Sequence, residues 1–392
     1  MRSFLAKDSD QVTLSNWRQA PFNRWGFQHV RELVPTADIP NDATIARSFS
    51  IDLTDFNDLT IRGDRRLRLD RALKLTNTDG IIVLRRGTLV YERYENGLGA
   101  ETPHILMSVS KSLLGLLCGI LIDRGELDPN RTISDILPAL ATTAYSGATV
   151  RDLLDMRAGV YFEEDYLASS GPIIAYRKAT NWNPLEPGER PSDLRTFFQE
   201  MRQSLGPHGG HFNYVSPNTD LLGWVIEQVT GRRYADLISE FLWKPIRAWR
   251  SAYITVDGLG APRCAGGFCA TLRDLALIGQ VVAQNGQIDG VQIVPREWIA
   301  DMARNGDPTA WFAAPFSQNF PGREMHYRSQ WYAQRNRDPM LFALGIHGQW
   351  LFVDHRQNIV MAKLSSQEEP LDSAKIALTM DIFDGLRDVL KY

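Results

Sequence analysis

The residues with the clearest chemical potential are a serine and a lysine three positions apart. Ser108 and Lys111 form the only Ser-x-x-Lys in the chain. Residues at this spacing share one face of a helix, so the lysine amine can reach the serine hydroxyl. A neutral amine there could take the serine proton and turn the oxygen into a nucleophile. The spacing alone is weak evidence, because a charged lysine whose stem lies on the surface would give the same pattern.

The helix expected to carry this pair spans 105–125. Its leucines and isoleucines are spread too widely around the axis for a surface helix, which predicts a buried one that ends at Gly125. Near its N-terminus, unpaired N–H groups and the helix dipole would stabilise negative charge at Ser108, whose own N–H could serve an oxyanion hole. For Lys111 to act as a base, burial must lower its pKa by roughly three units.

Two further segments could complete such a site. Tyr214 stands just before Ser216-Pro217, a pair typical of a helix N-cap and first turn, and its hydroxyl could relay a proton to a leaving group. Gly345, in a predicted strand, would allow close backbone approach by a substrate, and N–H groups there could complete the oxyanion hole. Taken alone, Tyr214 is better explained as a tyrosine that fills a loop, and Gly345 could be an ordinary strand glycine.

The elements that must position these residues predict an α+β fold. We expect one mostly antiparallel sheet flanked by helices, with an inserted helical domain. The chain would form a single unit over 1–392, with an α/β part at 1–125 and 251–392 and a mainly helical part at 126–250. The expected strands are a hairpin at 80–96 and the runs 341–345, 349–354 and 358–364. The expected helices, besides 105–125, are 148–156, 192–204, 217–230, 233–243 and 373–390.

Composition limits the classes of partner. The 392 residues are 44% hydrophobic with a net charge of −3 and scattered basic residues, so no nucleic-acid partner is expected. No apolar run is long enough to span a bilayer, and the N-terminus lacks a signal-peptide core, which predicts a cytoplasmic protein with no membrane partner. No cofactor is expected. His208 with His211, and Cys264 with Cys269, lack the further ligands of a metal site, so no metal is expected either.

The chain resembles the serine β-lactamase and penicillin-binding-protein superfamily in its class C/esterase branch, most closely the nylon-oligomer (6-aminohexanoate-dimer) hydrolases. The runs that carry the resemblance are Trp17 to Pro35, Leu106 to Ser112, Glu164 to Tyr166, Tyr214 to Asp220 and Gly345 to Gln349. It implies a β-lactamase-like fold and a serine hydrolase that forms an acyl-enzyme on Ser108. Lys111 and Tyr214 would then form the proton network, and the backbone N–H groups of Ser108 and Ile346 the oxyanion hole.

The resemblance also implies roles around the substrate. Tyr166 matches a tyrosine that assists amide cleavage, and Trp182 matches a tryptophan on a mobile loop that closes over the substrate. Gly345 is expected to flank the substrate, and His347 could take a polar role there. The superfamily's late-strand lysine, which helps bind a substrate carboxylate, is replaced by Ala343, which argues against β-lactam hydrolysis.

Two other departures bear on the nylon-oligomer activity. Ala265 stands in place of an asparagine, and residues 367–375 lack a histidine. The sequence therefore predicts a serine hydrolase of small amides or esters. The alternatives are a short-chain carboxylesterase without amidase activity on the nylon dimer, and a catalytically silent ligand-binding protein. A homodimer stays open, as does the acidic run 163–165, which is either a solvated turn or a site for an amine-bearing substrate.

Overall fold

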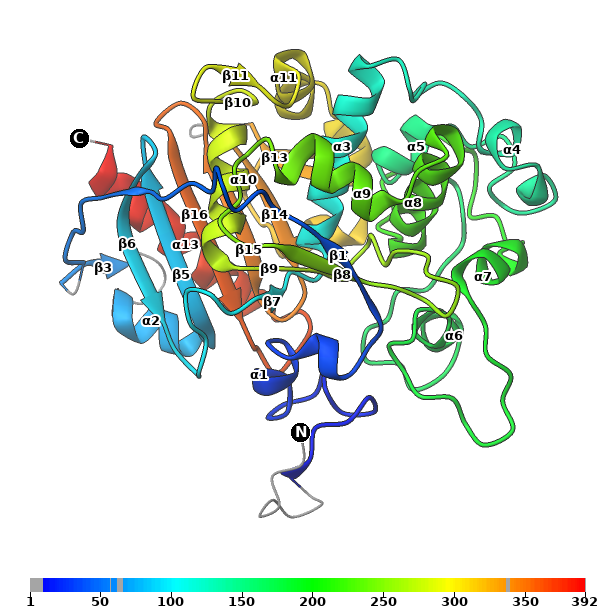
Figure 1. The fold of residues 1–392 in the computed structure, drawn as a ribbon, viewed down its shortest axis with the longest axis horizontal. Coiled ribbons are helices and arrows are strands. Elements are labelled where there is room, and N and C mark those ends of the chain that lie inside the picture. The colour runs from blue at the N-terminus through cyan, green and yellow to red at the C-terminus, as the bar shows by residue number, and fades with distance from the viewer. Residues whose placement is uncertain (1–9, 57, 62–65, 336–338, 392) are drawn as a thin grey trace.

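The computed structural model describes residues 10–56, 58–61, 66–335 and 339–391, and within them one large sheet dominates (Figure 1). Its eight strands follow the order β12-β13-β14-β15-β16-β5-β6-β2. They are β2 (Ser50–Ile51), β5 (Thr78–Arg85), β6 (Thr88–Tyr94), β12 (Met325–Arg328), β13 (Trp331–Gln334), β14 (Met340–Gly345), β15 (Gln349–Asp354) and β16 (Ile359–Ser365). β2 runs parallel to β6 and the other pairs are antiparallel, which confirms the predicted sheet.

Strands from the two ends of the chain meet where β16 pairs with β5. The β5–β6 hairpin turns through Arg86 and Gly87, at φ of 50° and 81°, as a tight hairpin turn requires. Alternate residues of each strand point to opposite faces, so the sheet buries two separate cores. Ile82 and Leu84 pack in one core with helices α3 and α10, whereas Ile81 and Val83 pack in the other with α2 and α13.

Helices therefore cover both faces of the sheet. α3 (Val109–Asp123), α10 (Leu272–Ala283) and α11 (Arg296–Arg304) lie on one face, and α2 (Leu69–Leu75) and α13 (Ser373–Leu390) on the other. α13 matches the predicted closing helix in full. The remaining short elements outside 126–250 are α1 (Asn23–Gly26), η2 (Val30–Glu32), β3 (Thr60–Ile61), β4 (Leu67–Arg68), β10 (Gln287–Ile288), β11 (Val291–Gln292), α12 (Pro308–Phe312) and η5 (Pro315–Asn319).

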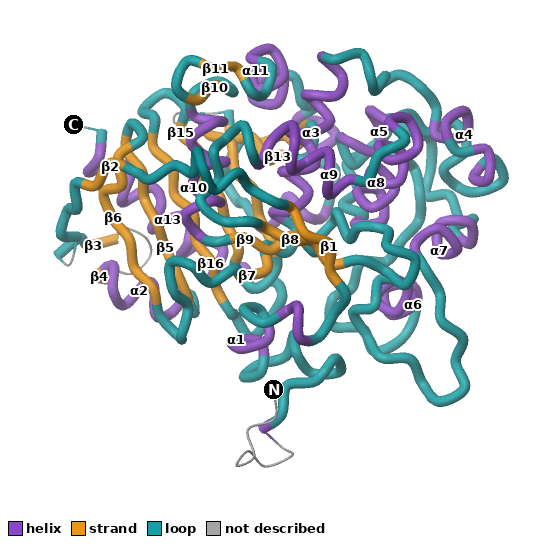
Figure 2. The backbone as a smooth tube through the Cα atoms, viewed as in Figure 1, coloured by secondary structure: helices purple, strands orange, loops and turns teal. Residues whose placement is uncertain are grey.

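Residues 126–250 carry helices only, gathered beside α3 (Figure 2). They are α4 (Ile133–Ile136), η3 (Pro138–Leu140), α5 (Val150–Leu154), α6 (Pro172–Ala179), α7 (Leu194–Glu200), α8 (Ser216–Thr230), α9 (Tyr234–Ile238) and η4 (Ser239–Trp243). The predicted helices at 148–156 and 192–204 are shorter than expected. The division into an α/β part and an inserted helical part stays a prediction. None of the described helices has the length and apolar character that crossing a membrane requires.

A second, four-stranded sheet leads the chain into α3. Its order is β1 (Thr36–Ile39), β8 (Ala252–Thr255), β9 (Phe268–Ala270) and β7 (His104–Ile105). The predicted helix over 105–125 was wrong at its start, because His104 and Ile105 pair with β9 and the helix begins only at Val109. Its end was correct, with Gly125 at φ 72° just after the last turn.

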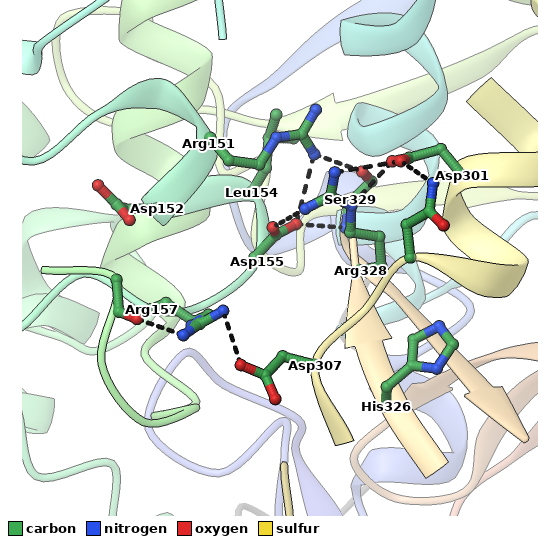
Figure 3. A network of polar contacts seen from close by, with 12 residues as sticks. Arg151, Asp152, Leu154, Asp155, Arg157, Asp301, Asp307, His326, Arg328 and Ser329 are labelled. Carbon is green, nitrogen blue, oxygen red and sulfur yellow. Dashed lines mark hydrogen bonds and ion pairs between the residues drawn. The ribbon is translucent and has the colours of Figure 1, made fainter. Parts of the chain in front are cut away.

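The turn between β12 and β13 fixes α3 against the helical region. Arg328 forms ion pairs with Asp155, after α5, at 2.6 Å and with Asp301 on α11 at 2.8 Å (Figure 3). The Ser329 N–H donates to Asp155 at 2.9 Å, and the Ser112 hydroxyl on α3 donates to the carbonyl of Gln330 at 2.7 Å. The helix that follows Ser108 is thus connected through this turn to the end of α5 and to α11.

Candidate active site

Ser108 stands at a strained turn between β7 and α3. The residue before it, Met107, is buried and has a φ of +46°, a left-handed conformation that is unfavourable for a bulky side chain. Such a residue costs about 1–3 kcal/mol and persists only where its surroundings hold it. Here the N–H of Leu106 donates to Phe268 at 2.8 Å, and that of Val109 donates back to Leu106 at 3.1 Å. The turn leaves Ser108 half-buried at the N-terminus of α3.

Gly345 at the end of β14 packs directly against this turn. A Cβ atom on Gly345 would lie 2.7 Å from the Leu106 carbonyl and 3.0 Å from the Ser108 nitrogen, so only glycine fits. Gly345 thus packs closely on the protein backbone, and its expected place beside the substrate stays a prediction. This packing brings the next residue, Ile346, to the same cavity as Ser108. Their backbone N–H groups as an oxyanion hole stay a prediction.

Lys111 is buried with its amine against Ser108. The side chain is 1% exposed, and Nζ lies 2.8 Å from Ser108 Oγ, 3.0 Å from Ser216 Oγ and 2.7 Å from the Ala265 carbonyl. Burial lowers the Lys111 pKa to about 7, although the carboxylate of Glu164 acts in the opposite direction. This is the fall that a lysine base needs, and it excludes the surface-stem explanation.

Tyr214 lies beside both Ser108 and Lys111. Ser108 and Tyr214 line one small pocket, Lys111 Nζ lies 4.9 Å from the centre of the Tyr214 ring, and this ring stacks on Phe316 with centroids 5.3 Å apart. Burial, reinforced by the Glu164 carboxylate, raises the Tyr214 pKa, so the phenol keeps its proton while Lys111 loses its own near neutrality. The environments push the two pKa values apart, which suits Lys111 as base and Tyr214 as proton donor.

Ser216 and Glu164 extend this cluster, and sequence reasoning missed both. Ser216 donates to Glu164 through its N–H at 2.6 Å and also through its hydroxyl, and Tyr166 donates to the same carboxylate at 2.7 Å. Ser216 was wrongly predicted as the N-cap of α8, because Val215 takes that position and the Ser216 hydroxyl bonds Glu164 instead. No local pattern reveals a contact between residues 52 positions apart.

Tyr166, Trp182 and Ile346 lie around one cavity with Ser108. The cavity is lined by Arg18, Met107, Ser108, Glu164, Tyr166, Ile173, Arg177, Trp182, Ser216, Arg263, Ala265, Gly266 and Ile346. Trp182 is buried in the cavity wall, where its indole donates to Thr255 at 3.1 Å and packs edge-on against Trp17. It is therefore not a surface aromatic; the motion of its loop stays a prediction.

His347 has a different environment from the one expected. Its Nδ1 lies 2.8 Å from the Gln367 carbonyl, and its ring packs edge-on against Phe27 at 5.2 Å. Burial lowers the His347 pKa to about 4, so the ring is neutral near pH 7. His347 lines the wider outer cleft rather than the cavity that holds Ser108.

The weak metal candidates are engaged elsewhere or isolated. His208 accepts from the Gly159 N–H at 3.0 Å, and its other ring nitrogen lies 3.0 Å from the Ser146 carbonyl. Cys118, Cys264 and Cys269 are free and buried. In the part of the chain that the structure describes, no three His, Cys, Asp or Glu side chains gather as a metal site would need.

Comparisons with known proteins agree with this geometry. The family model described as Beta-lactamase matches residues 75–381. The 6-aminohexanoate-dimer hydrolase of Paenarthrobacter ureafaciens is 36% identical over 360 residues, which cover 92% of this chain and 89% of that protein. A solved Bacillus anthracis structure, provisionally named a 6-aminohexanoate-dimer hydrolase, superposes with a TM-score of 0.89 at 26% identity over 98% of both chains. EstCE1, a hydrolase with promiscuous acyltransferase activity, shares the fold at 16% identity with a TM-score of 0.62 over 81% of this chain and 98% of its own.

Proposed function

Because the chain belongs to the beta-lactamase family of serine hydrolases, we propose that it cleaves small esters and amides through an acyl-enzyme on Ser108. The observation that carries this proposal is the 2.8 Å contact between Lys111 Nζ and Ser108 Oγ at the wall of an open cavity. A buried amine with a pKa of about 7 is a competent base at neutral pH. A silent binding protein would have no need of this pairing.

The reaction begins with proton transfer from Ser108 to the neutral Lys111 amine. The serine oxygen attacks the substrate carbonyl, and the resulting oxyanion is stabilised by the N–H groups of Ser108 and Ile346. The bond to the leaving group then breaks as Tyr214 gives it a proton, and the proton held by Lys111 restores the tyrosine. Water attacks the acyl-enzyme with the same groups in reverse order, which releases the acid and regenerates Ser108.

Esters are the substrates that this constellation serves most directly, because an alcohol or phenol leaves more easily than an amine. Ala343 is fully buried within β14 and offers no cation to a β-lactam carboxylate. The Ala265 carbonyl accepts from Lys111, so this position supports the base through its backbone. We therefore rank short acyl esters first, small amides second and β-lactams last.

The test compares the wild type with Ser108→Ala on p-nitrophenyl acetate and butyrate, the linear 6-aminohexanoate dimer, and nitrocefin. We expect ester turnover by the wild type only, and a mass increase equal to the acyl group on Ser108 after rapid quenching. Turnover by Ser108→Ala at the wild-type rate would refute the nucleophile. Rapid nitrocefin hydrolysis would refute the ranking of substrates.

A further inference from the structure

Three guanidinium groups from distant parts of the described chain face the cavity that holds Ser108. Arg18 comes from the N-terminal segment, Arg177 from α6 and Arg263 from the loop before β9. Arg263 forms a buried ion pair with Asp220. Within residues 10–56, 58–61, 66–335 and 339–391, no carboxylate forms an ion pair with Arg18 or Arg177. The cavity wall therefore holds more positive than negative charge.

The contacts of Arg18 and Arg177 are with neutral groups. Arg177 is 9% exposed and donates to the Tyr166 carbonyl at 3.0 Å. Arg18 donates to the Asn183 side chain, while its buried Nε has no hydrogen-bond partner. A guanidinium has five donors, so both arginines keep donors available for a ligand.

The carboxylate of Glu164, which also lines the cavity, does not neutralise these arginines directly. Its oxygens accept from the N–H and hydroxyl of Ser216 and from the phenol of Tyr166. The neighbouring Asp165 caps the Leu167 N–H at 2.9 Å. The inward-facing carboxylate of the acidic run 163–165 thus accepts hydrogen bonds within the catalytic cluster. This weakens the alternative that the run binds an amine-bearing substrate.

The arginines also repel one another. Burial, together with the charges of Arg177 and Arg263, lowers the pKa of Arg18 to about 9, so Arg18 stays charged at neutral pH. Burial lowers the pKa of Arg177 as well. The ring of Trp182 lies 5.9 Å from Arg18 and 5.0 Å from Arg263, which holds both groups in place. An anion between the arginines would relieve this repulsion.

A second side of Ser108, which shares Tyr166 and Ile346 with the cavity, is lined mainly by apolar and aromatic side chains, and this indicates how a substrate lies. Tyr214 stands there with Phe316, Tyr332, Leu344 and Leu371. If Tyr214 protonates the leaving group, the leaving group must occupy this apolar side. The acyl chain then runs the other way, towards the arginines.

We propose that Arg18 and Arg177 bind a carboxylate at the far end of the acyl chain, so that the preferred substrates are half-esters or half-amides of short dicarboxylic acids. This inference rests on the proposed acyl-enzyme at Ser108. Guanidinium groups suit a terminal carboxylate because they pair with it through two parallel hydrogen bonds. Hydrolysis would release the free diacid and an alcohol or amine.

The outer cleft sets a limit on the length of that chain. The cleft shares Arg18, Arg177, Tyr166 and Ile346 with the inner cavity and continues to an acidic rim of Glu186, Glu189, Glu368 and Glu369. Lys178 pairs with Glu189 at 2.6 Å and Lys375 with Glu368 at 2.7 Å, so the rim carries no excess positive charge. A long anionic chain would reach this rim, whereas a short one ends at the arginines.

The experiment compares kcat/KM for p-nitrophenyl hydrogen adipate and p-nitrophenyl hexanoate, whose acyl chains are equally long. The wild type is measured beside Arg177→Gln, Arg18→Gln and the matched control Lys178→Gln, an adjacent cation that is already paired. We expect the wild type to prefer the adipate ester by about ten- to a hundredfold. Both arginine variants should lose most of this preference, and Lys178→Gln should retain it.

The ratio of the two substrates is the readout, because any general loss from moving Tyr166 affects both equally. Equal rates on both esters in the wild type, or a preference that survives both arginine variants, would overturn the inference while leaving ester hydrolysis intact. A third ester, with the carboxylate on the phenol, should gain nothing; a preference for it would place the anion on the leaving-group side and also overturn the inference.

A direct binding measurement distinguishes failure of the proposed hydrolysis from failure of the proposed carboxylate site. If no ester is turned over, calorimetry with monomethyl adipate and with methyl hexanoate on Ser108→Ala still decides the matter, because only the first carries a carboxylate. Tighter binding of monomethyl adipate that Arg177→Gln abolishes would support the carboxylate site on its own. Equal affinity for the two esters would refute it.

Discussion

Two buried lysines, Lys111 and Lys363, have nearly the same environment and are expected to do different things. They are 1% and 0% exposed, and burial lowers the pKa of each to about 7. Each amine bonds a serine hydroxyl and a backbone carbonyl: Ser108 at 2.8 Å for Lys111, and Ser365 at 2.5 Å for Lys363. Neither amine forms a direct hydrogen bond with a carboxylate within the described residues.

They differ in what lies beyond the serine. Ser108 lines an open cavity, whereas Ser365 is fully buried on β16, where its N–H donates to Gln349 at 3.0 Å. Lys363 lies between β15 and β5, opposite Trp350 and Ile81. A lowered pKa thus reports burial alone. A base for catalysis also needs a nucleophile that a substrate can reach.

The largest expected effect separates the two lysines by activity. Lys111→Ala should lower kcat/KM on p-nitrophenyl butyrate by about a hundred- to ten-thousandfold, because the serine loses its base. Lys363→Met should stay close to the wild type, since it changes only the sheet interior. Circular dichroism and urea unfolding would verify that both variants fold. Similar losses in both variants would mean that the lysines act through stability and not through chemistry.

A smaller effect concerns the pH at which Lys111 becomes active. Because the neutral amine is the base, log kcat/KM should fall below about pH 7 in the wild type. The Glu164 carboxylate favours the charged amine, so Glu164→Gln should move this fall in kcat/KM to lower pH. It should also reduce the maximal kcat/KM by about tenfold. Lys363→Met, as the control, should leave the pH at which kcat/KM falls unchanged. A shift to higher pH in Glu164→Gln would contradict the electrostatic role of Glu164.

The smallest effect is on stability. The folded pKa of Lys363 lies near 7 and its ordinary value is 10.5, so between these values the unfolded chain binds more protons. The free energy of unfolding should therefore rise with pH across this window. Lys363→Met lacks this contribution, so it should be about 1 kcal/mol more stable at pH 7 and lose the advantage by pH 10. Urea titrations at several pH values would measure this; an unchanged slope would mean that Lys363 titrates normally.

Local sequence patterns determined much of the fold. The hairpin around Arg86-Gly87, the late strands and the closing helix 373–390 follow from turn residues and periodicity, which need only near neighbours. The Ser108–Lys111 spacing is likewise local, and an apolar helix already implied the fall in the lysine pKa. The start of α3 was misjudged because β7 forms only by pairing with a strand more than 160 residues away.

Tertiary structure alone decided which groups meet at the site. Ser216 and Ala265 contact Lys111 from two separate segments, and Glu164 joins the cluster through Ser216. Arg18 and Arg177 line the cavity from the N-terminal segment and α6. Nothing in the sequence distinguishes Lys111 from Lys363 by burial, because both sit in apolar surroundings. The sequence determined the candidate nucleophile and its neighbouring lysine. Packing decided that this lysine, and not the other, contacts a serine that lines a cavity, because only the assembly of distant segments creates a cavity.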